Sequence, residues 1–296
     1  MAKGKVVLYL GGGAMAGVFG AGVVTRLQDV DFYGQVDTIY ASSAGVFNVA
    51  YFLARQTRLG SSIYYEDLIQ GFIHPGRLIP GMFQRFRDRS LSLEDRKRVL
   101  NVCDIDYLME VVRTKKVLDV EKIKSEHTPS FAKVFNIDED RLKYIDLREN
   151  PLSVLHQSSS VVPYYSPFYG QTNIDGGVIE QIGFERVRQR HPNGQIIFCI
   201  NYHPKQFNNL KTSLRNSLEG IVASWIFPNK GMFNRFKNKT NNFNEDINRI
   251  MGDKHSLLIH PPLDNRTRQD TVDSKTLKET WEMGIKEAEK ILEWAG

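Results

Sequence analysis

Apolar runs and segments with helical periodicity alternate along the first part of the chain. Residues 5–10 form a continuous apolar run, and residues 36–42 form a second strand-like segment. Each leads through a turn of small residues into a segment with apolar positions at helical spacing, 17–29 and 44–55. Continuous apolar strands are typical of a parallel sheet that is covered on both faces. The pattern therefore predicts an α/β fold with three layers, α/β/α, around a mainly parallel central sheet.

Later segments extend this pattern. Residues 131–137 and 142–147 are predicted to pair across the acidic turn 138–140, and residues 195–201 and 257–260 are predicted as two further strands. The sheet is therefore expected to gain an antiparallel pair as well as additional parallel strands.

Two regions depart from the alternation. Residues 60–114 show no strand pattern, and we expect a helical, basic cap over the functional site there. A final helix is predicted from Ser274. We expect a catalytic core over residues 1–203 and a C-terminal helical extension over residues 204–296 that packs on the same domain. The apolar stripe of the final helix consists of Leu277, Trp281, Ile285, Ala288 and Leu292.

Composition narrows the class of protein only slightly. The chain has 296 residues, of which 41% are hydrophobic and 25% charged, as in ordinary globular proteins. The net charge of +5 and the pI near 9.0 fit an anionic partner, but the excess is modest and an ordinary solubility surface explains it better. Two cysteines make no disulfide framework, and no apolar run reaches the roughly 18 residues of a membrane-spanning helix. We therefore expect a cytoplasmic protein.

A glycine-rich loop, Gly11-Gly12-Gly13, joins the first strand to the first helix. Such a loop aims several backbone N–H groups at one point, where they can hold a phosphate or a developing oxyanion. The spacing Gly11-x-Gly13-x-x-Ala16 also fits a dinucleotide-binding fingerprint. That alternative needs an acidic residue at the end of the second strand, which ends instead in serines, so acyl transfer is favoured.

A serine elbow follows the second strand, in the sequence Ala41-Ser42-Ser43-Ala44-Gly45. It is close to the G-x-S-x-G pattern in which a nucleophilic serine projects from a sharp strand-to-helix turn. The small residues Ala41 and Gly45 allow the strand and the helix to approach each other. A serine that merely caps the helix explains the same residues equally well.

An aspartate turn, Asp175-Gly176-Gly177, lies far downstream. On its own, Asp-Gly indicates only a turn. In a partly buried site, however, desolvation could raise the pKa of Asp175 enough for its carboxylate to act as a general base for Ser43.

The order and flanks of these three motifs resemble the patatin-like phospholipase family, from about residue 5 to residue 203. The resemblance implies a lipid acyl hydrolase of the phospholipase A or lysophospholipase type that needs no cofactor. Ser43 would be the nucleophile and Asp175 its base, and the backbone amides of Gly12, Gly13 and Ala14 would form the oxyanion hole. Two positions depart from the family pattern: Ala16 replaces the usual Arg or Lys, and Ala41 replaces a glycine. The supporting motif residues are Gly11, Gly17, Ala41, Gly45, Gly176 and Gly177.

Two alternative functions remain compatible with the same residues. A Ser-Asp-His esterase would use His260 or His203 with Ser43 and Asp175, in the chain order of α/β-hydrolases. A catalytically degenerate, lipid-binding relative would keep the fold without turnover. The seven histidines show no HxxxH or HExxH spacing, so we expect no catalytic metal.

Two similar segments, 81–87 and 231–237, each place two phenylalanines three residues apart beside basic side chains. This composition suits an anionic lipid interface, single-stranded nucleic acid, or ordinary surface helices with buried rings. Beside a lipase-like site we favour peripheral contact with a membrane and expect no nucleic acid. The oligomeric state is not predicted. The candidate membrane-contact residues are Phe83, Phe86, Trp225, Phe227, Phe233 and Phe236.

Overall fold

A seven-stranded sheet forms the centre of the computed structural model, which describes residues 5–77, 79–81, 83, 101–165, 172–206, 210–228 and 230–295. The strands follow the order β4-β3-β2-β1-β6-β7, with β5 paired to β3. The pairs that join β3, β2, β1, β6 and β7 are parallel, whereas β4 and β5 run antiparallel to β3. The strands are β1 (Val6–Leu10), β2 (Val36–Ala41), β3 (Ser130–Asn136), β4 (Arg141–Asp146), β5 (Asn173–Asp175), β6 (Gln195–Cys199) and β7 (Ser256–Ile259).

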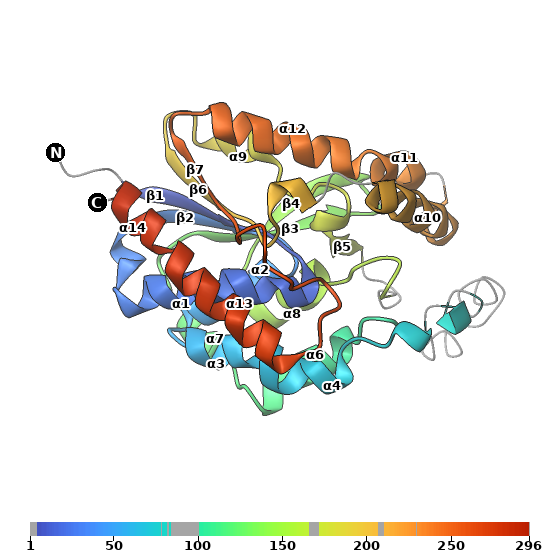
Figure 1. Cartoon of the computed structure of the whole chain (residues 1–296), viewed down its shortest axis with the longest axis horizontal. Coiled ribbons are helices and arrows are strands. Elements are labelled where there is room, and N and C mark those ends of the chain that lie inside the picture. The colour runs from blue at the N-terminus through green and yellow to red at the C-terminus, as the bar shows by residue number, and fades with distance from the viewer. Residues whose placement is uncertain are drawn as a thin grey trace.

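Helices cover both faces of this sheet, which confirms the predicted three-layer α/β/α fold (Figure 1). One face packs against α1 (Val18–Asp29), α2 (Ala44–Leu53), α8 (Pro151–Ser158) and α13 (Ser274–Glu287). The other packs against α9 (Phe184–Arg190) and α12 (Lys239–Gly252). The structure describes further α-helices, namely α3 (Thr57–Ser62), α4 (Leu68–Gly71), α6 (Ile105–Thr114), α7 (Val120–Lys124), α10 (Leu210–Ile226), α11 (Met232–Lys237) and α14 (Glu289–Ala295).

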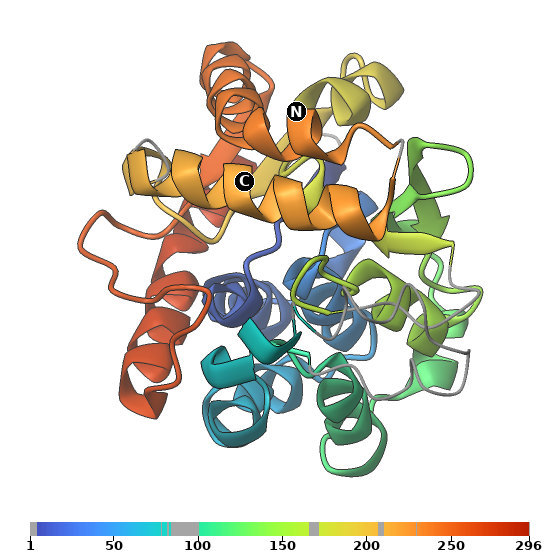
Figure 2. The ribbon, with the colours of Figure 1, turned by 90° about the vertical axis from the view of Figure 1, so that its right-hand side faces the viewer.

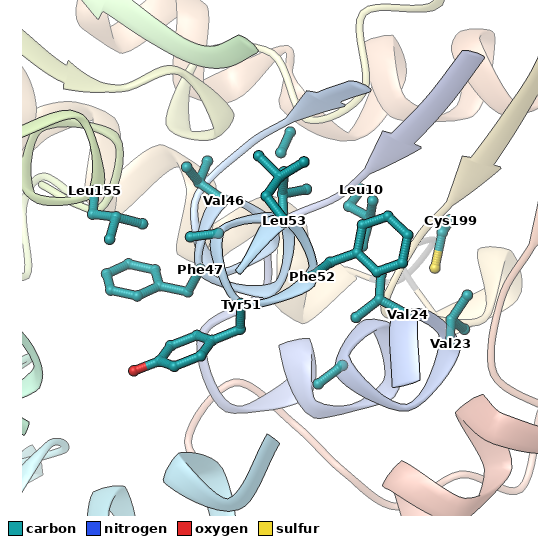
Figure 3. Close-up of a cluster of buried hydrophobic side chains, with 14 of the residues drawn as sticks. Leu10, Val23, Val24, Val46, Phe47, Tyr51, Phe52, Leu53, Leu155 and Cys199 are labelled. Atoms are coloured by element: carbon teal, nitrogen blue, oxygen red, sulfur yellow. The ribbon is translucent and has the colours of Figure 1, made fainter. Parts of the chain in front are cut away.

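The central strand β1 shows why its sequence is apolar throughout. Val6, Leu8 and Leu10 join the core beneath α1 and α2, whereas Val7 and Tyr9 join the core beneath α9 and α12. Side chains alternate between the two faces of a strand, so burial on both faces requires apolar residues at every position. Figure 3 shows the larger core, in which Leu10 and Cys199 meet residues of α1 and α2 such as Val23 and Phe52.

The described part of the predicted helical region 60–114 is mainly helical, with turns and an isolated β-bridge between Ile73 and Cys103. After α3 the chain continues through a π-helical turn, Ile63–Asp67, into α4. Residues 84–100 of the predicted cap, including Phe86, lie outside the described residues.

The C-terminal segment takes part in the sheet as well as in the helical layers. Strand β7 pairs in parallel with β6, so the sheet continues across the predicted boundary at residue 203. Helix α13 packs on α1, with Gly22 and Gly284 at their contact. In the part of the chain that the structure describes, no helix is long and apolar enough to cross a membrane.

Candidate functional site

The topology of β3 brings the serine elbow and the aspartate turn together. Strand β2 runs parallel along one edge of β3 and ends with Ala41 opposite Ala132. Strand β5 runs antiparallel along the same edge and ends with Asp175 opposite Val134. The two strands therefore approach each other end to end, and the residues that follow Ala41 meet Asp175.

Ser43 occupies a strained backbone conformation between β2 and α2. Its φ of 53° and ψ of −128° are rare for a residue with a side chain, and α2 begins at the next residue. Gly45 is required by the close contact with β1, because a Cβ there would lie 2.4 Å from the carbonyl oxygen of Leu10. This is the geometry of a sharp elbow that projects a serine from the end of the sheet.

Asp175 is buried, with 2% of its surface exposed. Its carboxylate accepts a hydrogen bond from the backbone N–H of Gly177 at 2.7 Å, and the neighbouring Ser43 hydroxyl stabilises its ionised form. Burial raises the pKa of Asp175 to about 6, while the Ser43 hydroxyl, the Gly177 N–H and the charge of Lys133 act in the opposite direction. The carboxyl group is thus a stronger base than an ordinary aspartate.

The glycine-rich loop lies beside Ser43 because β1 and β2 are adjacent and parallel, with Leu10 opposite Ala41. Gly13 has a φ of 145° and Ala14 a φ of 47°. Among the described residues, the N–H groups of Gly12, Gly13 and Ala14 donate no hydrogen bond to a protein acceptor. These three donors, which line the same cavity as Ser43, are available to a ligand.

Two residues that the sequence analysis did not single out hold this loop from behind. The Asn201 side-chain amide donates to the carbonyl oxygens of Gly11 and Gly12 at 2.8 and 2.9 Å, and its oxygen accepts the N–H of Gly20. The Tyr202 hydroxyl donates to the carbonyl oxygen of Gly13 at 3.0 Å. Both lie just after the end of β6, and that position beside β1 is the only signal that could have indicated their role.

Lys133 was also missed, because a lysine in a strand is ordinarily taken as solvent-facing. Its fully buried ammonium donates to the carbonyl oxygen of Ile182 at 2.9 Å and to the Tyr9 hydroxyl at 3.3 Å. It also lies 3.8 Å from the Glu180 carboxylate. Burial lowers the pKa of Lys133, and the nearby Glu180 charge partly offsets that effect. Lys133 thus ties β3 to the segment that follows Asp175.

A cavity of about 1360 Å³ opens over these groups. Ser43, Asp175 and the glycine-rich loop line one part of it, together with the motif residues Gly11 and Gly177. Ligand pockets are commonly about 300–1,000 Å³, so this cavity has room for a long flexible ligand. Much of its wall is apolar and comes from α2, α4, α6 and the turns beside them, as in Phe47, Tyr51, Ile63, Leu68, Phe72 and Leu108.

The histidines proposed for a triad lie elsewhere. The rings of His203 and His260 contact each other, with centroids 4.8 Å apart, and neither residue is among those that line the cavity. The ionisable group beside the Ser43 hydroxyl is instead the carboxylate of Asp175. Within the described residues there is no cluster of three His, Cys, Asp or Glu side chains that could hold a metal ion.

The candidate membrane-contact residues fall into different environments. Phe83, Trp225 and Phe233 are exposed, whereas Phe227 is partly buried against the core that includes Ala223. Phe236 is only 1% exposed and belongs to that core, so its assignment as a membrane contact was wrong. The periodicity of residues 231–237 could not show which of the two rings faces inward.

Substitution of Gly12 by alanine is expected to reduce activity at least about 100-fold. The added methyl carbon would lie 2.6 Å from Cβ of Ser43, closer than carbon atoms tolerate, and must displace the loop or the serine. Turnover of a soluble ester by Gly12→Ala tests this. Gly252→Ala is the matched control, because its added methyl meets nothing within 4 Å. Equal activity of the two variants would contradict the expectation.

Comparison with known sequences identifies the family. The profile described as patatin-like phospholipase matches residues 8–187, more than half of the chain. The protein therefore belongs to the patatin-like phospholipase family, and this places it among the hydrolases of lipid esters. This assignment favours the acyl-transfer interpretation of the glycine-rich loop over the dinucleotide-binding alternative. No curated protein matches the sequence at a significant level.

Solved structures show more distant similarities. The chain resembles VipD from Legionella pneumophila with a TM-score of 0.41 and 12% identity, over 99% of this chain and 67% of VipD. It also resembles the ExoU–SpcU complex of the type III secretion system of Pseudomonas aeruginosa with a TM-score of 0.40 and 14% identity, over 99% of this chain and 52% of the matched chain. The chain thus spans about two thirds and about half of these proteins.

Proposed function

We propose that the protein is a serine acyl hydrolase of phospholipid or lysophospholipid esters that uses a dyad of Ser43 and Asp175. The observation that carries this proposal is the position of the Ser43 hydroxyl beside a buried Asp175 whose pKa is raised to about 6. A carboxylate that is poised near neutral pH and lies beside the nucleophile can take its proton without a histidine.

The reaction would proceed in two steps through an acyl-enzyme. Ser43 Oγ attacks the ester carbonyl carbon as its proton passes to Asp175, and the N–H groups of Gly12, Gly13 and Ala14 stabilise the oxyanion. The C–O bond to the alcohol breaks, and Asp175 protonates the leaving oxygen. Water then attacks the acyl carbon as its proton passes to Asp175. The bond between that carbon and Ser43 Oγ breaks, and Asp175 returns the proton to Oγ, so that the fatty acid and free Ser43 result. No step requires a metal or a cofactor.

The apolar wall of the cavity supports a substrate with a long acyl chain. Residues of α2, α4 and α6 line it beside Ser43. An acyl chain that lies along this wall would present its ester carbonyl to the serine, which is the arrangement that a phospholipase A or a lysophospholipase needs.

The environment of the glycine-rich loop favours an active enzyme over a degenerate, lipid-binding relative. Ala16 stands where the family pattern has a basic residue, but its N–H donates to the carbonyl oxygen of Gly13 at 3.0 Å. Together with Asn201 and Tyr202, this bond holds the loop beside Ser43 without a basic side chain.

Labelling with a fluorophosphonate ester tests the nucleophile directly. The probe is expected to modify Ser43 in the native protein, as shown by peptide mass mapping, because only an activated serine attacks it. If folded protein stays unlabelled in both the absence and the presence of lipid vesicles, the catalytic proposal fails and the degenerate alternative gains support.

The pH dependence of turnover should follow the ionisation of Asp175. The carboxyl group must be ionised to accept the serine proton, so kcat/KM is expected to fall about tenfold for each pH unit below about 6 and to level off above it. Rates with an uncharged, soluble ester between pH 4 and pH 9 measure this. An inflection near pH 4, where an ordinary aspartate titrates, would show that Asp175 is not the base.

A further inference from the structure

Helix α10 carries an exposed apolar strip along one face. The spacing of its residues by four, three and four positions places them in a row on a helix. Contiguous exposed apolar surface of this kind is uncommon on soluble domains and marks an interaction site. The strip consists of Leu214, Leu218, Ile221 and Trp225, with 62%, 56%, 38% and 37% of their surfaces exposed.

Helix α11 extends this strip by one aromatic residue. The backbone of Phe233 lies against Gly220 of α10, and Phe233 is 38% exposed, whereas Phe236 from the same helix turns into the core. An aromatic ring therefore lies beside the apolar row.

The opposite side of α10 belongs to the substrate cavity. Arg215, Asn216 and Glu219 line it, and Glu219 is buried, where it accepts a hydrogen bond from Tyr164 at 2.7 Å and forms an ion pair with Arg215 at 3.0 Å. Glu219 is the only acidic residue in the sequence of α10. The exposed face of the helix thus carries no negative charge, and it lies next to the cavity.

Exposed cations occupy the rim of the same cavity. Lys205, Arg266 and Arg268 line it and are exposed, and none of the three forms an ion pair with another described residue. Asp270 is an exposed acid on the same rim, which leaves an excess of positive charge. The rim joins α10 through a hydrogen bond of 3.1 Å from Arg215 to Gln269. In Figure 2, α10 crosses the middle of the face toward the viewer.

We propose that the apolar strip of α10 and the cationic rim form a docking face for an anionic phospholipid bilayer. The strip would enter the headgroup layer while Lys205, Arg266 and Arg268 meet lipid phosphates. A bilayer fits better than a protein partner because this apolar row and these unpaired cations border the cavity that takes the lipid. Docking would turn the cavity toward the membrane. A role of the docking face in turnover rests on the proposed function, but docking itself can be measured without catalysis.

Sedimentation with vesicles tests the apolar strip. Ser43→Ala protein is used as the parent, so that no lipid is hydrolysed, and vesicles contain equal parts of phosphatidylglycerol and phosphatidylcholine. The variant Leu214→Ser/Leu218→Ser/Ile221→Ser is expected to bind at least tenfold more weakly than the parent. The control Val117→Ser/Met251→Ser/Val272→Ser removes three exposed apolar side chains elsewhere, with 54%, 73% and 47% of their surfaces exposed, and should bind within twofold of the parent. No binding by the parent, or equal loss in both variants, would overturn the proposal.

A second pair of variants tests the cationic rim. Lys205→Gln/Arg266→Gln/Arg268→Gln should lose most of the preference for these vesicles over pure phosphatidylcholine, and its binding should depend less on salt. The control Lys254→Gln/Lys275→Gln/Lys286→Gln removes the same charge from exposed positions away from the cavity and should keep the preference. An unchanged preference in the rim variant would overturn the electrostatic part of the proposal.

Turnover distinguishes this inference from the proposed function. With Ser43 restored, the strip variant should show at least a tenfold lower ratio of vesicle hydrolysis to hydrolysis of a soluble short-chain ester. If the strip variant and the native protein showed the same ratio of vesicle hydrolysis to soluble-ester hydrolysis, docking would not be a step in turnover. Vesicle binding by a native protein that hydrolyses neither substrate would support the docking face and refute the hydrolase.

Discussion

Replacement of Ser43 by alanine is expected to lower ester turnover by a factor on the order of 10⁵–10⁶, the scale of loss when a catalytic serine is removed. Without Oγ no acyl-enzyme can form, and the oxyanion donors alone cannot supply a nucleophile. The fold should persist, because alanine adopts the φ of 53° at this elbow at a cost similar to that of serine. Initial rates with a soluble ester, together with thermal unfolding, measure both effects.

Ser42 provides the matched control for that experiment. It is the preceding residue, is completely buried, and its hydroxyl has no hydrogen-bond partner among the described residues. Ser42→Ala removes the same atom from the adjacent position and should keep turnover within tenfold of the native value. A loss in Ser42→Ala comparable to that in Ser43→Ala would mean that the elbow, and not the Ser43 hydroxyl, was being disturbed.

His260 distinguishes the dyad from a triad. Its Nδ1 lies 2.8 Å from the carbonyl oxygen of Pro261, and its ring contacts His203 away from the cavity. His260→Ala should therefore leave turnover within a few-fold of the native value. A loss as large as that caused by Ser43→Ala in a folded protein would restore the Ser-Asp-His alternative.

The sequence predicted the proximity of Ser43 to the glycine-rich loop for a physical reason. Consecutive strands that are each followed by a helix pair in parallel, so the loops after their carboxyl ends lie side by side. This is the relation between the loop after Leu10 and the elbow after Ala41. Local pattern and chain order suffice for that part of the site.

The position of Asp175 could be predicted only through the resemblance to a family. Strand β5 has three residues and pairs antiparallel with β3, and neither feature has a clear periodic signal in the sequence. The same limit applies to Asn201, Lys133 and the apolar strip of α10. Their roles depend on which distant segments pack against them, and side-chain type alone pointed to solvent for Lys133 and to the interior for Leu214.

Asp175→Asn should lower turnover by a factor on the order of 10⁴, because the amide keeps the shape of the side chain but cannot accept the serine proton. Rates measured at pH 8, where the native carboxyl group is ionised, test this. Detectable turnover above about 1% of the native value would show that another group serves as the base.

The same substitution should affect stability in the opposite direction at neutral pH. The carboxyl group titrates near pH 3.8 when unfolded and near pH 6 when folded, so the unfolded chain binds fewer protons between these values. Native stability therefore falls as the pH rises from about 4 to 6 and stays lower above pH 6, by roughly 3 kcal/mol for a shift of about two pH units. An asparagine does not ionise, so it avoids this cost.

Urea unfolding at pH 4 and pH 8 measures that linkage. The difference in the free energy of unfolding between Asp175→Asn and the native protein should shift by roughly 1–3 kcal/mol in favour of the variant's stability from pH 4 to pH 8. Ser43→Ala leaves the carboxyl group in place and should keep most of the native pH dependence. If Asp175→Asn were equally destabilised at both pH values, the carboxylate would be a structural acceptor. A gain in stability at pH 8 accompanied by a loss of turnover would show that the protein maintains an unfavourable buried charge because its reaction requires one.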